Sequence, residues 1–200
     1  MIQKLAETTL PTVHGNFIML AYDSGKDDFP HVVLVNGDLS AHHPVDVRIH
    51  SECMTGDVFS SVRCDCGEQL DTSMHHFGQK GGILIYLRQE GRGIGLVNKM
   101  KAYNLQNEGL DTIKANHALG FHTDERNFED AIEILHDLGV NRINLLTNNP
   151  EKIDAFTNSG IEVVERIAIE IRPREENAAY LKTKRSGMGH FFSSLELGED

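Results

Sequence analysis

The stretch GGILIYLRQEGRGIGLVNKM (residues 81–100) decides the fold class, because it combines a strand, a glycine-rich turn and the start of a helix. Residues 81–87 form a short apolar run, which predicts a buried β-strand. Glycines recur at Gly91, Gly93 and Gly95, and residues 94–106 then read as a helix. A strand that leads directly into a helix is typical of α/β proteins.

The sequence on both sides of this stretch extends the pattern. The N-terminal part is β-rich, with strand signals at residues 16–23, 31–38 and 44–50. Further strands are expected at 142–147 and 161–171, and helices are expected around 70–77, over 128–138, after Asn149 as N-cap and over 175–189. We therefore predict an α/β (α+β) fold, as a single domain over residues 1–200. It would have an N-terminal β-rich part, a mixed sheet flanked by helices and a flexible tail from about residue 190.

Composition sets limits on the class of protein. Hydrophobic residues make up 40% of the 200 residues, which is ordinary for a globular protein, and no apolar run is long enough to cross a bilayer. The N-terminal residues lack the apolar core of a secretion signal, so we expect a cytoplasmic protein with no membrane partner. A net charge of -11 argues against non-specific binding of nucleic acid, although local arginines could still bind a small anion.

All three cysteines lie within HSECMTGDVFSSVRCDCGEQLD (residues 50–71), as Cys53, Cys64 and Cys66. In a cytoplasmic protein, clustered thiols more often bind metal than form disulfides. Sulfur ligands favour zinc, and a helix that begins near Cys66 would help to keep its thiolate ionised. The alternative is three unrelated buried cysteines, which the concentration of all three in one polar segment disfavours.

The odd number of cysteines bears on the kind of metal site. A catalytic zinc has three protein ligands and one position for water, whose pKa the metal lowers. A structural Cys3His site stays possible, because His50, His75 and His76 are close in sequence.

Three other segments suggest an anionic ligand. The first is the glycine-rich turn with Arg88 and Arg92, whose backbone could approach a phosphate, although an ordinary strand-to-helix connection is equally consistent with it. The second is LLTNNPEK (residues 145–152), in which Lys152 lies in the first turn of an expected helix. A cation is unfavourable at that end of a helix unless an anion binds beside it. The alternative is a lysine that is simply solvated.

The third segment, FHTDERNF (residues 121–128), offers Asp124 as a general base and Arg126 as a phosphate clamp. Helix capping by Asp124 or Asn127 is the alternative explanation.

Four segments together resemble GTP cyclohydrolase II, over nearly the whole chain. They are RIHSECMTGDVFSSVRCDCGEQL (48–70), YLRQEGRGIGLVNKMKAYNLQNEGLDT (86–112), ANHALGFHTDER (115–126) and LLTNNPEKI (145–153). The resemblance implies hydrolysis of GTP to formate, pyrophosphate and 2,5-diamino-6-(5-phospho-D-ribosylamino)pyrimidin-4(3H)-one, the first committed step of riboflavin biosynthesis. It also implies a homodimer with one Zn²⁺ per chain, and Mg²⁺ bound with the triphosphate.

The same resemblance implies roles for individual residues. Zinc would be held by Cys53, Cys64 and Cys66, with Asp124 as proton acceptor, Arg126 acting at the α-phosphorus and Tyr103 assisting ring opening. We expect Arg126 to stabilise charge rather than to attack, because a guanidinium holds its proton tightly. The residues implied in GTP binding are Arg48, Ile49, His50, Ser51, Glu52, Gln69, Glu90, Gly91, Arg92, Thr112, Thr147 and Lys152.

Two other classes of function compete with this hypothesis. One is a nucleotide sensor or scaffold with a structural Cys3His zinc and no turnover. The other is a zinc-dependent nucleic-acid binder, which the acidic charge disfavours.

Overall fold

The computed structural model describes residues 2–26, 29–39 and 44–191, apart from the side chain of residue 179. Most of the tail expected from about residue 190 therefore lies outside the described residues. The chain forms two compact units. Unit 1 comprises residues 1–50, 70–88 and 127–169, and unit 2 comprises 51–69, 89–126 and 170–200. The predicted α/β class is confirmed, whereas the single 1–200 domain stays a prediction.

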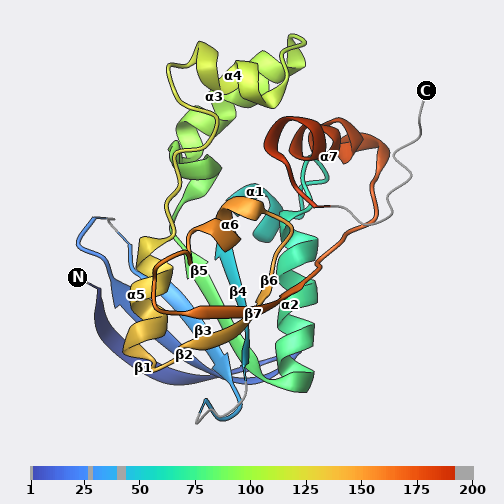
Figure 1. Cartoon of the computed structure of the whole chain (residues 1–200). Helices are drawn as coiled ribbons and strands as arrows, with labels where there is room; N and C mark the ends of the chain where they lie inside the picture. Colours follow the sequence, from blue (N-terminus) through green and yellow to red (C-terminus); the bar gives the residue numbers. More distant parts are fainter. Residues whose placement is uncertain (1, 27–28, 40–43, 192–200) are drawn as a thin grey trace. The chain divides into compact units, whose positions relative to one another are not determined.

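Unit 1 contains a seven-stranded mixed sheet (Figure 1). The strand order is β1-β2-β3-β5-β4-β6-β7, in which β1, β2, β3 and β5 pair antiparallel and β4, β6 and β7 pair parallel. The strands are β1 (Gln3–Thr12), β2 (Gly15–Asp23), β3 (His31–Asn36), β4 (Val45–Ser51), β5 (Gly82–Leu87), β6 (Arg142–Leu146) and β7 (Glu162–Ile167).

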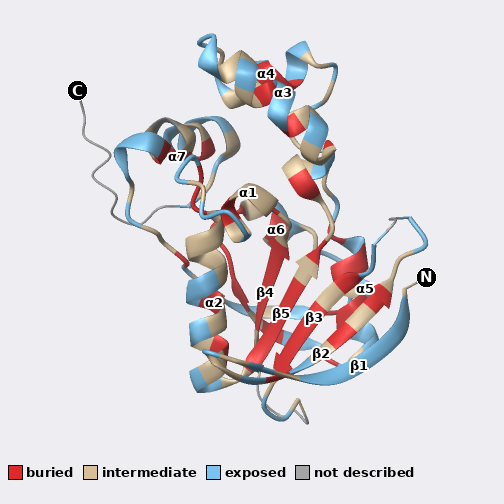
Figure 2. Ribbon diagram, turned by 180° about the vertical axis from the view of Figure 1, so that it is seen from behind, coloured by how far each residue is buried: buried red, intermediate tan, exposed pale blue. Residues whose placement is uncertain are grey.

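Helices α5 (Glu129–Asp137) and α2 (Cys66–Lys80) cover opposite faces of the sheet. Side chains alternate between faces along a strand, so Ile83 and Ile85 of β5 pack with α5 while Leu84 packs with α2. Figure 2 shows the resulting buried residues along the central strands and α5. A short helix, α6 (Pro150–Asp154), follows β6 and has the predicted cap, in which the Asn149 side chain accepts from the Glu151 N–H at 3.0 Å.

Two expectations differ from the observed sheet. Strand β1 was not predicted, because it is a largely exposed edge strand without apolar alternation. The strand expected over residues 161–171 ends at Ile167 in the structure. Beyond it, the Asn148 side chain donates to the carbonyl of Ile169 at 2.7 Å and accepts from its N–H at 3.1 Å, so a side-chain amide replaces the backbone ladder.

Unit 2 is helical and contains the first residues of α2. Its other helices are α1 (Met54–Asp57), the 3-10 turn η1 (Glu90–Gly93), α3 (Gly95–Asn107), α4 (Thr112–Ala118) and α7 (Glu175–Met188). Helix α4 packs against α3 and α7, and the Asp111 side chain caps it by accepting from the Lys114 N–H at 2.8 Å. The predicted transition from a glycine-rich turn to a helix after β5 is confirmed. None of the described helices is long and apolar enough to span a membrane.

The hairpin between β1 and β2 lies directly against α2 in unit 1. A Cβ on Gly78 would lie 1.8 Å from the carbonyl oxygen of His14, which is backbone and cannot rotate away. We expect Gly78→Ala to destabilise the protein by about 1–3 kcal/mol, as overpacking does. At a solvent-exposed helix position, replacing Gly by Ala would instead stabilise the protein by up to about 1 kcal/mol. Urea unfolding of Gly78→Ala, with Thr72→Ala on the exposed side of the same helix as control, checks the sign. A Gly78→Ala protein as stable as the wild type would contradict this packing.

Candidate functional site

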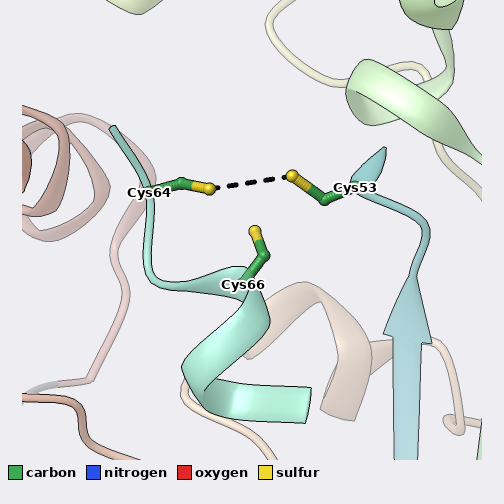
Figure 3. Close-up of side chains that lie close together, drawn as sticks. All are labelled: Cys53, Cys64 and Cys66. Atoms are coloured by element: carbon green, nitrogen blue, oxygen red, sulfur yellow. Dashed lines mark hydrogen bonds between the residues drawn. The ribbon is translucent and has the colours of Figure 1, made fainter. Parts of the chain in front are cut away.

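The three cysteines converge in unit 2. Their sulfur atoms all lie within 4.8 Å of one another, and Cys53 Sγ is 3.7 Å from Cys64 Sγ. Figure 3 shows the sulfurs pointing toward a common centre, with Cys53 just after β4 and Cys66 at the first turn of α2. Three mutually close sulfurs can ligate one zinc ion together, so the predicted ligand set is brought together.

Two glycines make this convergence possible. A Cβ on Gly67 would lie 2.3 Å from the carbonyl oxygen of Gly56, and a Cβ on Gly56 would lie 3.0 Å from Cys64 Sγ. The segment after Cys53 can therefore contact the start of α2 backbone to backbone. The Asp57 carboxylate also accepts from the Cys53 N–H at 2.9 Å, which fixes the first ligand.

Histidine does not join the sulfur group in the part of the chain that the structure describes. In unit 1, His76 Nε2 lies 2.6 Å from the Asp46 carboxylate, His75 Nε2 lies 3.0 Å from Gln79, and His50 stacks on Tyr86. The donor set thus fits a metal with three sulfur ligands.

The thiols differ in acidity. Hydrogen bonds from Cys64 and Cys66, with a further contribution from Lys99, lower the pKa of Cys53. The hydrogen bond to Cys53 raises the pKa of Cys64 to about 11, and hydrogen bonds to the other two thiols together with burial raise the pKa of Cys66. Cys66 was the thiolate expected from its place at a helix start. Without metal, however, the favoured thiolate is Cys53, because close thiols cannot all ionise and Lys99 lies beside Cys53.

Lys99 connects the cysteines to the glycine-rich turn. Its Nζ donates to Cys53 Sγ at 3.1 Å and to Glu90 Oε1 at 2.8 Å, and both side chains of this ion pair are at most 10% exposed. Glu90 also accepts from the Met54 and Gly91 N–H groups at 2.7 Å. Sequence reasoning missed Lys99, because a lysine on a helix is normally solvated.

The glycine-rich turn itself has an unusual backbone. Gly91, Arg92, Gly93 and Gly95 all have positive φ, with 62° at Arg92. The Arg92 O accepts from the Glu125 N–H at 3.1 Å, so the turn is bound to the Asp124–Arg126 segment. Buried Nη1 of Arg92 has no hydrogen-bond partner among the described residues, which is the arrangement expected of a group that binds an anion.

Asp124 and Arg126 form a nearly buried ion pair, with side chains 9% and 12% exposed. The Arg126 Nε donates to Asp124 Oδ1 at 2.8 Å, and its Nη1 donates to Ser51 Oγ at 3.3 Å. Burial favours the neutral acid, but the hydrogen bonds and charge of Arg126, aided by the charge of Arg92, outweigh it and lower the pKa of Asp124. Asp124 is therefore a carboxylate at neutral pH. Of the two residues considered as helix caps, Asn127 accepts from the Glu129 N–H at the start of α5 at 3.3 Å, whereas Asp124 accepts from the Arg126 N–H before the helix.

Tyr103 of α3 lies near the same network. Its ring centroid is 5.8 Å from Lys99 Nζ and 4.9 Å from the Arg63 guanidinium carbon. Burial raises the pKa of Tyr103, so its phenol stays protonated and can donate a proton.

A second polar group lies in unit 1, at the carboxyl ends of the parallel strands β4 and β6. Arg48 Nη1 donates to the Leu146 carbonyl at 2.8 Å, and Lys152 Nζ donates to the Ile49 carbonyl at 2.7 Å. Thr147 is also buried there, and its hydroxyl accepts from the Asn149 N–H at 3.0 Å. Lys152 is only 5% exposed, so the alternative of a solvated lysine is wrong. Ligands commonly bind at this edge of a parallel sheet.

The predicted GTP-binding residues are divided between the two units. In unit 2, Gln69 donates to Asp65 at 2.6 Å and Thr112 begins α4. The members in unit 1 are Arg48, Ile49, His50, Thr147 and Lys152, and those in unit 2 are Ser51, Glu52, Gln69, Glu90, Gly91, Arg92 and Thr112.

Comparison with known proteins gives a family match over most of the chain. A family model described as GTP cyclohydrolase II matches residues 3–168. The riboflavin biosynthesis protein RibBA of Chlorobium phaeovibrioides is 49% identical over 194 residues, which cover 96% of this chain and 47% of that protein. The GTP cyclohydrolase-2 of Buchnera aphidicola subsp. Acyrthosiphon pisum is 49% identical over 193 residues, which cover 96% of this chain and all of that protein.

These relatives differ in length. The chain spans about half the length of the RibBA proteins that it matches and the full length of the Buchnera protein. Among solved structures, the RibBX protein of A. baumannii, a two-domain 3,4-dihydroxy-2-butanone 4-phosphate synthase, has a TM-score of 0.48 at 19% identity. That match covers 85% of this chain and 40% of the other.

The buried contact between Lys99 and Glu90 generates a prediction. Lys99→Met would leave the Glu90 carboxylate buried without its cation. We expect the free energy of unfolding to fall by about 3 kcal/mol, which is the lower end of the range for removing one partner of a buried ion pair. Lys101→Met removes the same charge from the exposed side of α3 and should change stability by less than about 0.5 kcal/mol. Urea unfolding followed by circular dichroism measures both. Equal stabilities of the two variants would show that the ion pair is dispensable.

Proposed function

The chain belongs to the GTP cyclohydrolase II family, and we propose that it hydrolyses GTP to formate, pyrophosphate and 2,5-diamino-6-(5-phospho-D-ribosylamino)pyrimidin-4(3H)-one. The observation that carries the proposal is the convergence of the three sulfurs within 4.8 Å in a member of this family. We place the reaction at the first committed step of riboflavin biosynthesis, in a cytoplasmic homodimer.

Cys53, Cys64 and Cys66 would hold one zinc ion per chain, with Mg²⁺ accompanying the triphosphate of GTP. When bound, zinc would supply Lewis-acid activation of water near neutral pH. The substrate loses two C–N bonds of its imidazole ring, which release C8 as formate, and one phosphoanhydride bond, which releases pyrophosphate. Each cleavage consumes one water molecule.

The residues around the cysteines have properties that suit these steps. Tyr103, which stays protonated, would donate a proton to a ring nitrogen as its C–N bond breaks. Asp124, which stays ionised, would accept the proton of an attacking water. Both residues are partly buried, which limits the access of bulk water to them.

The cationic residues would bind the triphosphate. The guanidinium of Arg92, whose buried Nη1 lacks a hydrogen-bond partner among the described residues, and that of Arg126 would neutralise phosphate charge. We assign a GTP contact to Gly91 in the left-handed turn, in which Gly95 leaves the backbone open, since a Cβ on Gly95 would meet no other atom within 4 Å. We assign the remaining GTP contacts to the unit 1 residues Arg48, Ile49, His50, Thr147 and Lys152, and to Ser51, Glu52, Gln69, Glu90 and Thr112.

A direct assay tests the proposal. We expect the purified chain, supplied with GTP, Zn²⁺ and Mg²⁺, to release formate and pyrophosphate in equal amounts and to form a new pyrimidine absorbance. Metal analysis of the same preparation should find one zinc per chain. Bound zinc and bound GTP without formate would favour the nucleotide sensor, and a salt-dependent shift of labelled RNA would favour the nucleic-acid binder.

Two variants separate the metal ligands from the proton acceptor. Cys66→Ser should lose both zinc and formate release, because it removes one of three sulfur ligands. Asp124→Ala should keep zinc while its rate of formate release falls about 100-fold or more, the usual contribution of a general base. Zinc content and formate release measured on both proteins decide the matter. Full activity with retained zinc in Cys66→Ser would show the ligand assignment to be wrong.

A further inference from the structure

Helix α7 contacts the loop that carries two of the cysteines. Lys184 Nζ lies 2.7 Å from Asp65 Oδ1, and the two side chains are 10% and 2% exposed. Asp65 is the single residue between Cys64 and Cys66. This buried ion pair therefore holds the loop at the position between two proposed ligands.

The other oxygen of Asp65 is bound from α2. Gln69 Nε2 donates to Asp65 Oδ2 at 2.6 Å, and the Gln69 N–H donates to the Asp65 carbonyl at 3.0 Å. Each carboxylate oxygen thus has a partner on a different helix. Such a carboxylate has little freedom to rotate, and this restricts the backbone that carries the neighbouring cysteines.

Helix α7 also approaches the glycine-rich turn. The Tyr180 ring centroid lies 4.6 Å from Lys184 Nζ and 5.7 Å from the Arg92 guanidinium carbon. Leu181 is fully buried, so this side of α7 is a packed surface. The family match ends at residue 168, before α7 begins.

We propose that α7 is a functional part of the metal site and that Lys184 is a positioning residue, which holds the Cys64–Cys66 loop in its metal-binding conformation through Asp65. The inference rests on the proposed function in taking zinc as the metal. Groups that orient metal ligands without touching the metal commonly change metal affinity 10- to 100-fold when they are removed. Neither α7 nor Lys184 belongs to the set of residues assigned to zinc or GTP above.

The test compares two lysines of one helix in the full-length protein. Lys184→Met removes the buried ammonium, whereas Lys182→Met removes the same charge from the exposed side of α7. Competition for Zn²⁺ with a chromophoric chelator should show affinity weakened about 10- to 100-fold in Lys184→Met. In Lys182→Met the affinity should stay within about twofold of the wild type.

A spectroscopic readout separates positioning from general stability. In the Co²⁺-substituted protein, the thiolate-to-metal charge-transfer band reports the geometry of the sulfur ligands. We expect this band to shift or weaken in Lys184→Met and to recover at least partly in Lys184→Arg, which keeps a cation. An unchanged band and unchanged zinc affinity in Lys184→Met would overturn the inference.

A double variant keeps the test decisive if Lys184→Met does not fold. Asp65→Asn combined with Lys184→Met removes both charges and leaves no unpaired ion. If the pair acts as one unit, the zinc affinity of this double variant equals that of the single variant Asp65→Asn within about twofold and is weaker than that of the wild type. A double variant that binds zinc much more weakly than Asp65→Asn, or as tightly as the wild type, would contradict the proposal. GTP turnover by the wild type is measured separately, so its absence would count against the proposed function and not against the role of α7.

Discussion

The close backbone contact between Gly56 and Gly67 is the constraint on which the rest of unit 2 depends. A methyl group on Gly67 would collide with the Gly56 carbonyl at 2.3 Å, so any other residue would separate the segment after β4 from the first turn of α2. Cys53 lies on the first of these segments and Cys66 on the second. Such a separation would move Cys53 relative to Cys66, whose sulfurs now lie, with that of Cys64, within 4.8 Å of one another. Gly56 and Gly67, which have no functional side chain, therefore help to determine whether the three cysteines can bind one metal together.

Three ion pairs with little solvent exposure lie in unit 2: Lys99 with Glu90, Lys184 with Asp65, and Arg126 with Asp124. Buried pairs are weak evidence for stability, because desolvation offsets much of their attraction. Their placement is more informative, since each pair fixes a segment that carries proposed ligands or catalytic groups. Lys99 has a further effect, because three thiolates around one divalent ion leave a net negative charge and its ammonium lies 3.1 Å from one sulfur. With a metal bound, unit 2 would thus stabilise an anionic centre in a protein of net charge -11.

Sequence reasoning succeeded where one segment contains the whole signal. The cysteine spacing, the apolar period of α5 and the Asn149 cap are local patterns; the structure brings the three sulfurs together and confirms the helix and its cap. It failed where a residue takes its role from a distant partner: Lys99 lies 46 residues from Cys53, and Lys184 lies 119 residues from Asp65. Strand β7 ends early for the same reason, since the amide that replaces its ladder belongs to Asn148, 21 residues from Ile169. Charged residues are normally solvated, and nothing in the local sequence around Lys99 or Lys184 marks these two lysines as buried.

The pairing of Asp124 with Arg126 links the two roles proposed for them. Arg126 donates to both oxygens of Asp124, which lowers the pKa of the carboxyl group and makes it a weak base in the free protein. The same contacts favour the protonated guanidinium, so Arg126 suits charge stabilisation and not attack on phosphorus. A triphosphate that draws Arg126 away from Asp124 would remove hydrogen bonds from the carboxylate, while burial would continue to favour the neutral acid. The pKa of Asp124 would then rise, and the base would become stronger only when substrate is bound.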